Sequence, residues 1–354
     1  MRHLELFSGV GGFRQALDLL SLDFGLKNKS IGFSEIDNNA VKTYKANFNT
    51  SREIEMGDIV SFVSNKDKLE SLPDFDIITG GFPCQSFSMM GKQKGFKDVR
   101  GNVFFQIIDI IKEKKPKFIL LENVRNLKTH DKGKTFDTVL KFLKEAGYPN
   151  IYHDIFNTED FGLAQRRNRV YIFAAKKPLP KNFVFNSQII KKVFQDIKNK
   201  TSLLQQKNVL DVLDKKVDAK FFLSEVLKPT ILSNGTKNFR SKSDINQMIA
   251  RPLTATMVKM HRACQDNYFS QDFILDANEY NKRAYNKEEL AKKQIRRITP
   301  KEAFLFQGFN KKFIKNAEST GVSNHQLYRQ AGNAVSVNVV YAVFYYLFVY
   351  SELS

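Results

Sequence analysis

Cys84 is the residue of this chain best suited to covalent chemistry. It directly follows an apolar segment and precedes polar residues, in the run Gly80-Gly81-Phe82-Pro83-Cys84-Gln85-Ser86-Phe87-Ser88. A lone cysteine is by default a small buried hydrophobic residue. Polar neighbours and a preceding proline instead favour a thiol held out at a strand end, where a helix beginning nearby would lower the thiol pKa. The run therefore predicts an activated thiolate nucleophile.

Charged groups flank two other apolar segments. Leu120-Leu121-Glu122-Asn123-Val124 is a predicted buried strand that ends in a carboxylate. Gln165-Arg166-Arg167-Asn168-Arg169-Val170-Tyr171 places Arg167 and Arg169 on one face of a strand. Glu122 is either a helix cap or half of a salt bridge, or a carboxyl group with a raised pKa that holds or delivers a proton. The arginines are either an edge-strand surface or a clamp on an anion or carbonyl group. Because a predicted nucleophile is present in the same chain, we favour the proton-transferring carboxyl group for Glu122 and the anion or carbonyl clamp for the arginines.

A glycine-rich turn near the start of the chain suits a nucleotide-like ligand. Phe7-Ser8-Gly9-Val10-Gly11-Gly12 follows the first predicted strand and precedes a helix, which lets the backbone approach a ligand closely. The alternative is an ordinary tight turn. Glu35 ends the second predicted strand, where an acidic side chain usually holds a ribose hydroxyl pair, and Asp58 similarly suits an adenine amino group. Because no phosphate-binding lysine follows the glycines, a nucleoside cofactor is favoured over a nucleoside triphosphate.

Short apolar strands that alternate with amphipathic helices must position these residues. The expected strands are residues 4–7, 30–33, 76–79, 118–121 and 169–174, and the expected helices are residues 14–20, 39–47 and 104–112. This alternation is typical of an α/β fold with a doubly wound, mostly parallel sheet. Ligands bind at the carboxyl ends of the strands in such sheets, and the residues singled out above fall at those ends.

Positive charge is concentrated in the second half of the chain. The 354 residues carry 56 Lys and Arg against 37 Asp and Glu, a formal net charge of +19, which favours a polyanionic partner. Residues 176–300 hold 25 of the basic and 12 of the acidic residues. We therefore expect a basic domain at residues 190–294. Residues 1–185 and 296–354 would form the other domain, with the apolar residues 335–350 packing back onto it.

Composition argues against several other classes of protein. Hydrophobic residues make up 42% of the chain, enough for a sizeable core. Cys84 and Cys264 are the 2 cysteines, too few for a disulfide framework or a four-ligand zinc site, and the ligand-like spacing of His261 and Cys264 lacks partners; no metal is expected. The longest apolar run, residues 339–350, is too short to span a membrane, and a strand stands where a signal peptide would begin. A reducing, intracellular setting is expected.

Taken together, the motifs resemble those of one enzyme family. Phe-Ser-Gly-Val-Gly-Gly, Pro-Cys-Gln-Ser-Phe-Ser, Glu-Asn-Val, Gln-Arg-Arg-Asn-Arg and Gly332-Asn333-Ala334-Val335 follow one another as in cytosine-5 DNA methyltransferases, particularly the small enzymes of bacterial restriction–modification systems. The resemblance covers nearly all of residues 1–175 and 296–354. It implies a Rossmann-like, S-adenosylmethionine-dependent methyltransferase domain. It also implies that residues 190–294 form a smaller, basic target-recognition domain that binds double-stranded DNA.

The resemblance also implies a mechanism. Cys84 would attack C6 of a cytosine flipped out of the duplex, so that C5 becomes nucleophilic enough to take a methyl group. Glu122 would hold and protonate N3. Arg169, with Arg167 beside it, would bind the cytosine carbonyl group and help to fix the carboxylate. A base would then remove the C5 proton, and elimination would free Cys84.

The implied cofactor is S-adenosylmethionine, and the implied product is S-adenosylhomocysteine. Its expected contacts lie at strand ends or in the returning C-terminal segment: Phe7, Val10, Gly12, Glu35, Ile36, Asp58, Ile59, Pro83 and Asn333. The family's usual serine after the motif asparagine is replaced by Ala334. One cofactor hydrogen bond is therefore absent or made by the backbone.

DNA contacts are expected from a loop and from the basic domain. Residues 86–101 match the mobile loop that closes over DNA in this family. Residues 251–256 resemble its short threonine-containing recognition motif. The predicted DNA-binding residues are Gln85, Ser88, Lys92, Arg100, Arg251, Thr254 and Arg262.

Two alternatives stay open. Some relatives with the same catalytic core methylate cytosine in tRNA, although they tend to carry different residues after the cysteine. The other alternative is a catalytically silent DNA-binding homologue, against which an intact Cys84, Glu122 and Arg169 argue. The expected protein is a cytoplasmic, nucleoid-associated monomer without membrane contact. A cognate restriction endonuclease, acting separately, is a further partner that the resemblance allows.

Overall fold

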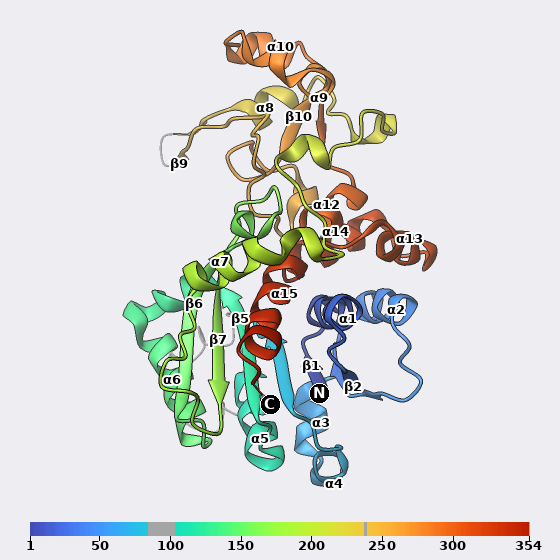
Figure 1. The fold of residues 1–354 in the computed structure, drawn as a ribbon. Helices are drawn as coiled ribbons and strands as arrows, with labels where there is room; N and C mark the ends of the chain where they lie inside the picture. Colours follow the sequence, from blue (N-terminus) through green and yellow to red (C-terminus); the bar gives the residue numbers. More distant parts are fainter. Residues whose placement is uncertain (84–102, 237–238, 354) are drawn as a thin grey trace. The chain divides into compact units, whose positions relative to one another are not determined.

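The computed structural model describes residues 1–83, 103–236 and 239–353, which pack as two compact units (Figure 1). The first unit is Met1–Asn157, Asn168–Leu203 and Val335–Ser354, and the second is Thr158–Arg167 and Leu204–Ala334. The sequence predicts that residues 296–354 belong to the same domain as residues 1–185. In the structure, residues 296–334 pack within the second unit. The assignment of catalysis and DNA recognition to separate domains stays a prediction.

A mostly parallel sheet forms the centre of the first unit. Within the described residues it has the strand order β3-β2-β1-β4-β5-β7-β6. The strands are β1 (Arg2–Leu6), β2 (Lys29–Ser34), β3 (Ile54–Glu55), β4 (Ile77–Gly81), β5 (Phe118–Val124), β6 (Asn150–Asn157) and β7 (Asn168–Ala175). β1 to β5 pair in parallel, whereas β7 is antiparallel to both β5 and β6. Strand order reverses between β1 and β4, which is where open α/β sheets bind ligands. The predicted α/β fold is confirmed.

Helices cover both faces of this sheet. They are α1 (Gly12–Phe24), α2 (Asn38–Asn47), α3 (Ile59–Ser64), α4 (Lys66–Ser71), α5 (Val103–Lys114), α6 (Lys134–Glu145), α7 (Ser187–Ile197) and α15 (Val337–Tyr345). On one face, Leu4, Ile78 and Leu121 are buried in one apolar cluster with side chains of α3, α5 and α6. On the other, Phe118 of β5 packs on Phe348, with 5.5 Å between ring centroids.

The C-terminal segment returns to the first unit, as predicted. Phe344 of α15 packs on Phe13 of α1 with 6.4 Å between ring centroids, and the Tyr341 hydroxyl donates to Asp23 at 2.7 Å. Among the described residues, one helical stretch, Asn324–Tyr350, is long and apolar enough to cross a membrane. Its most apolar window is 83% buried inside the protein, and a core helix gives the same signature.

Most of the expected elements of the first half are present within a few residues, but β6 was not predicted. Its residues, Asn150–Asn157, are mostly half-buried because it is the edge strand of the sheet. Such a strand lacks the continuous apolar run that reveals the buried strands beside it.

Short elements make up the second unit. They are β8 (Gly235–Thr236), β9 (Phe239–Arg240), β10 (Tyr268–Ser270), β11 (Ile295–Arg297), α8 (Lys228–Leu232), α9 (Gln271–Leu275), α10 (Ala277–Asn281), α11 (Lys287–Ala291), α12 (Pro300–Phe306), α13 (Lys311–Ser319) and α14 (Asn324–Asn333). Arg296 and Glu302 are both fully buried and form a two-pronged ion pair, with N–O distances of 2.7 and 2.9 Å. The Glu302 carboxylate also accepts from the Thr299 backbone amide at the start of α12. This ion pair leaves both charges compensated, so burying them is tolerated.

Candidate active site

A buried carboxylate and a guanidinium meet at the carboxyl edge of the first unit's sheet. Glu122 of β5 is 8% exposed, and Arg169 lies at the start of the antiparallel β7. The register places Arg169 opposite Val124, and Arg169 Nε reaches Glu122 Oε1 at 3.1 Å. The two side chains that the sequence paired are therefore in contact. Such a pair fixes the orientation of the carboxylate.

The backbone beside Glu122 is closely packed. A Cβ at Gly81, the last residue of β4, would lie 3.2 Å from Glu122 Oε2. Asn123 is buried, and its Nδ2 donates to the Phe82 carbonyl at 2.7 Å. Asn123 thus holds the backbone that leads from β4 to Pro83. The sequence indicates Asn123 only as part of a motif. Its hydrogen bond to the Phe82 carbonyl is seen only in the structure.

Cys84 and four of the predicted DNA-binding residues lie outside the described residues. The latter are Gln85, Ser88, Lys92 and Arg100. Their assignments stay predictions, and the described part of the site ends at the exposed Pro83.

The glycine-rich turn and Glu35 are bound to each other. The Gly9 amide donates to Glu35 Oε2 at 2.8 Å, and the amides of Ile36 and Asp37 donate to Oε1 at 2.9 and 2.8 Å. Three backbone amides thus orient the carboxylate beside the turn. Phe7 and Gly9 have φ angles of 51° and 53°, so the turn is left-handed where the chain leaves β1.

Two of the glycines are required by packing. A Cβ on Gly11, whose φ is 87°, would lie 2.4 Å from the Phe48 ring. A Cβ on Gly12 would lie 2.5 Å from Val335 Cγ2, just before α15. Larger residues at either position would push the turn away from α2 or from the returning chain. Val10 is 1% exposed and belongs to the core, so its side chain offers little surface to a ligand.

Three further cofactor candidates differ in what they expose. Ile36 is 73% exposed, unusual for so apolar a side chain next to a polar turn, and it suits the face of a flat ring. Asp58 is also exposed and caps α3, and the Ser61 hydroxyl holds the pKa of its carboxyl below the usual range. Ile59 is 2% exposed, which leaves only its backbone for a ligand.

A buried polar cluster that the sequence did not single out lies behind the turn. Glu5 of β1 is fully buried; it accepts from the Phe13 amide at 3.2 Å and from the Tyr44 hydroxyl at 3.3 Å. Burial raises the pKa of Glu5 to about 8, although the charge of Arg14 opposes this shift. His3, whose Nε2 is 2.7 Å from the Thr79 hydroxyl, has its pKa lowered to about 3 by burial. Glu5 links the first turn of α1 to α2.

Arg167 belongs to the second unit and has a different set of partners from Arg169. It is 2% exposed, and its guanidinium donates to the carbonyls of Leu253, Gly332 and Ala334 at 2.9, 3.1 and 2.9 Å. Its neighbour Gln165 accepts from the Leu253 amide at 2.9 Å. These contacts tie residues 253 and 332–334 together, which is a structural role. The predicted place of Arg167 beside the cytosine stays untested.

The remaining site candidates also lie in the second unit. Asn333, the last residue of α14, is exposed. It stands in the sequence between Gly332 and Ala334, whose carbonyls accept from Arg167. Thr254 is exposed, and its hydroxyl is 3.4 Å from that of Thr256. A Cβ at Gly332 would lie 2.3 Å from the Thr254 backbone, so this glycine allows the two segments to touch. Arg251 donates to the Asp244 carbonyl at 3.2 Å.

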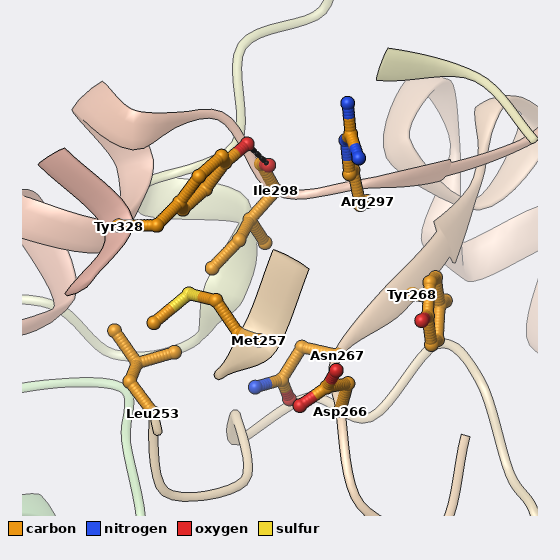
Figure 2. Close-up of a pocket in the computed structure, with 8 residues that line it drawn as sticks. All are labelled: Leu253, Met257, Asp266, Asn267, Tyr268, Arg297, Ile298 and Tyr328. Atoms are coloured by element: carbon orange, nitrogen blue, oxygen red, sulfur yellow. Dashed lines mark hydrogen bonds between the residues drawn. The ribbon is translucent and has the colours of Figure 1, made fainter. Parts of the chain in front are cut away.

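Figure 2 shows the residues that line a small cavity next to the segment 251–257: Leu253, Met257, Asp266, Asn267, Tyr268, Arg297, Ile298 and Tyr328. Its volume is about 10 Å³, the room of about one water molecule, so it cannot accept a nucleotide. Burial raises the pKa of Asp266 to about 6, and His261 at 3.3 Å opposes the shift. Asn267 donates to and accepts from the Arg251 backbone. The cavity belongs to the packing that supports the segment.

Comparison with solved structures defines the fold. Over 98% of both chains, the fold matches the Entamoeba histolytica methyltransferase EhMeth with a TM-score of 0.71 and 22% identity. It matches the S. pombe Dnmt2 methyltransferase over 98% of both chains with a TM-score of 0.70 and 19% identity. The fold is the Rossmann-like fold of such methyltransferases.

Sequence comparison gives the family. Residues 1–348 match the C-5 cytosine-specific DNA methylase family. Type II methyltransferase M1.ScrFI of Lactococcus lactis subsp. cremoris is 37% identical over 96% of this chain and 76% of its own. M.NgoBI of Neisseria gonorrhoeae is 35% identical over 96% and 90%, and the orphan methyltransferase M.SPRI of Bacillus phage SPR is 30% identical over 97% and 96%. The chain belongs to the C-5 cytosine-specific DNA methylase family and is a DNA (cytosine-5) methyltransferase.

Proposed function

We propose that this enzyme methylates C5 of cytosine within a specific sequence of double-stranded DNA, with S-adenosylmethionine as methyl donor. The observation that carries the proposal is the ion pair of Glu122 and Arg169, buried at the carboxyl edge of the sheet. Asn123, next in the chain, holds the backbone two residues before Cys84. A carboxyl group and a guanidinium thus lie at the carboxyl edge of the sheet, and Cys84 follows Phe82 by two residues in the sequence.

The reaction runs through a covalent bond between enzyme and base. The Cys84 thiolate adds to C6 while Glu122 gives a proton to N3, so electron density moves to C5. Arg169 binds the cytosine carbonyl and holds Glu122. Bound S-adenosylmethionine would supply an electrophilic methyl group to C5, and S-adenosylhomocysteine would leave. A base then removes the C5 proton, elimination breaks the bond between sulfur and C6, and N3 returns its proton to Glu122.

The residues around the glycine-rich turn fit a nucleoside. Glu35, oriented by three amides, would accept from the ribose hydroxyl pair, and the exposed Ile36 would cover the adenine face. Asp58 would accept from the adenine amino group. The turn itself would approach the ligand by its backbone, together with Phe7 and Pro83, while Asn333 would contribute from the C-terminal segment.

The cytosine must leave the duplex to reach this site. C5 and C6 cannot be attacked within the base stack, and flipping the base costs a few kcal/mol. The basic residues 190–294 would hold the duplex, with Arg251, Thr254 and Arg262 near the bases. Thr254 is exposed and has a firmly supported backbone, as such a contact requires.

A role in protecting host DNA from a restriction endonuclease agrees with the type II methyltransferases among the relatives. An orphan methyltransferase is also among them, so action without a partner nuclease is the alternative. We propose a cytoplasmic, nucleoid-associated enzyme that works as a monomer, since one asymmetric cleft for one flipped base requires no symmetry.

A competition assay tests the substrate. Purified enzyme and tritiated S-adenosylmethionine are incubated with plasmid DNA and tRNA in equal nucleotide amounts, and label is counted in each. Label in DNA, mapped by bisulfite sequencing to one repeated sequence, is the expected result. Label in tRNA alone would show that the substrate is tRNA and not DNA. Absence of label from both, with DNA binding retained, would leave a silent DNA-binding homologue.

A further inference from the structure

A short basic segment, residues 125–134, follows the strand that carries Glu122. It forms the 3₁₀ turns η3 (Arg125–Lys128) and η4 (His130–Gly133) and ends at Lys134, the first residue of α6. The segment contains four basic residues, Arg125, Lys128, Lys132 and Lys134, and a single acidic residue, Asp131. The segment lies outside the loop and the basic domain from which DNA contacts were predicted.

Three cations of this segment are exposed and unneutralised. Arg125, Lys132 and Lys134 form no ion pair with any carboxylate of the described residues. Elsewhere in the same unit, by contrast, Lys141 pairs with Glu145 at 3.7 Å, and Lys45 pairs with Glu55. Three exposed cations without counter-charges within ten residues give this segment a positive field that attracts an anion.

The segment is anchored from beneath. Leu127 is fully buried in the apolar cluster of the first unit. Lys128 Nζ lies 5.6 Å from the centroid of the Phe136 ring, and His130 Nδ1 is 2.6 Å from the Thr135 hydroxyl. Because these contacts fix the backbone, the three exposed cations are presented from a firm support and lose less entropy when they bind.

The backbone of the segment adopts an unfavourable conformation at its tip. Asp131 has φ 49° and ψ 47°, and Lys132 has φ 56° and ψ 30°; Gly133 follows with φ 91°. Aspartate tolerates the left-handed region, but lysine does not do so readily, and two such non-glycine residues in succession are uncommon. Strained backbone of this kind concentrates at sites of function.

Position then determines which anion is available. β5 is parallel to β4 and β1, so the segment starts at the carboxyl edge of the sheet, where Glu122 lies. Arg125 is three residues after Glu122, so their Cα atoms are at most about 11 Å apart. A duplex whose flipped cytosine reaches Glu122 brings the phosphates of the neighbouring nucleotides close to this segment.

We propose that residues 125–134 bind the DNA backbone phosphates that flank the flipped cytosine, through Arg125, Lys132 and Lys134. The proposal rests on the function proposed above and adds a DNA contact on the catalytic unit itself. These contacts position the duplex and carry no sequence information, so they act equally on every DNA sequence.

Charge variants with a matched control test this contact. The test variant is Arg125→Gln/Lys132→Gln/Lys134→Gln. The control is Lys27→Gln/Lys66→Gln/Lys68→Gln, which removes the same charge from exposed residues that precede the amino ends of β2 and β4. A second variant, Arg125→Lys/Lys132→Arg/Lys134→Arg, keeps the charge. DNA affinity is measured across a salt series, with KM and kcat for DNA and cofactor.

The test variant is expected to lower the slope of log affinity against log salt by about 2 to 3, since each phosphate contact contributes about 0.9. We expect KM for DNA to rise at least tenfold, while kcat at saturating DNA and KM for cofactor stay within twofold. The control and the charge-keeping variant should match the wild type. If the test variant and the control lost DNA affinity equally, the proposed role of this segment would be wrong. The same would follow if the test variant kept its DNA affinity while the wild type methylates DNA; neither result would contradict the proposed function. A wild type that labels no DNA would overturn both.

Discussion

The pairing of Glu122 with Arg169 allows a carboxyl group to be buried at the position where we propose that the cytosine binds. A carboxylate buried without a partner would be costly, and the guanidinium at 3.1 Å compensates its charge. The interaction engages Oε1, and Oε2 faces Gly81, which has no side chain to obstruct it. The ion pair thus fixes the orientation of the carboxyl group beside Gly81.

Replacing this carboxyl group should affect chemistry more than binding. Glu122→Gln keeps the shape but cannot deliver a proton to N3, so methyl transfer should slow by about 10²- to 10⁴-fold. Cofactor affinity should change less than about threefold, because the cofactor candidates lie around β1 and β2. Single-turnover rates and a cofactor-binding titration provide the two numbers. If affinity for the cofactor collapsed and the rate did not, Glu122 would belong to the cofactor site.

Glu5 predicts a pH dependence of stability. Burial raises its pKa from 4.5 to about 8. Between these values the folded protein binds more protons than the unfolded chain, so the free energy of unfolding falls as the pH rises. Glu5→Gln removes this contribution and should flatten the decline. Urea unfolding of both proteins between pH 6.5 and 8 isolates it, because His3, whose pKa is lowered to about 3 in the folded protein only, titrates equally in both unfolded chains and cancels in the difference. The same decline in wild type and variant would show that Glu5 is ionised in the folded protein.

At the scale of elements, the glycine-rich turn depends on the C-terminal segment. Gly12 begins α1, and the chain returns against it at Val335, 2.5 Å from where a Cβ would lie. The first and last elements of the fold therefore close on one another at this turn. This close approach explains why glycine is required at a position whose backbone any residue can adopt.

A double-mutant cycle measures that approach. Gly12→Ala should destabilise the protein by about 1 to 3 kcal/mol, the usual cost of overpacking. In a Val335→Ala background the same change should cost at least about 1 kcal/mol less, because the clashing methyl group is gone. Chemical denaturation of the four proteins gives the coupling energy. Additive effects would mean that the two residues do not touch.

Local sequence patterns predicted most of the buried strands and the glycine-rich turn, because each depends on neighbours close in the chain. They did not distinguish Arg167 from Arg169, which look equivalent two residues apart. The partners that separate them are distant: Arg167 binds carbonyls 86, 165 and 167 residues further along. Glu5 was taken only as part of a strand, because its burial comes from the packing of α1 and α2 over β1. Long-range packing of this kind cannot be read from spacing.

At the scale of the whole molecule, charge and chemistry are divided along the chain. Residues 176–300 carry most of the net charge of +19. Glu122, Arg169 and the glycine-rich turn belong to the first unit. A protein that only bound DNA would require the first feature alone. The presence of both features is why we propose base flipping and catalysis rather than simple DNA binding.

The most direct test of this account traps the covalent bond between Cys84 and cytosine. Enzyme and tritiated S-adenosylmethionine are mixed with a duplex containing 5-fluorocytosine at the methylated position, where fluorine prevents the final elimination. We predict an SDS-stable, labelled protein–DNA adduct with the wild type and none with Cys84→Ser, which should still bind the duplex. An adduct that persists in Cys84→Ser, or methylated DNA without an adduct in the wild type, would contradict the assignment of Cys84 as nucleophile.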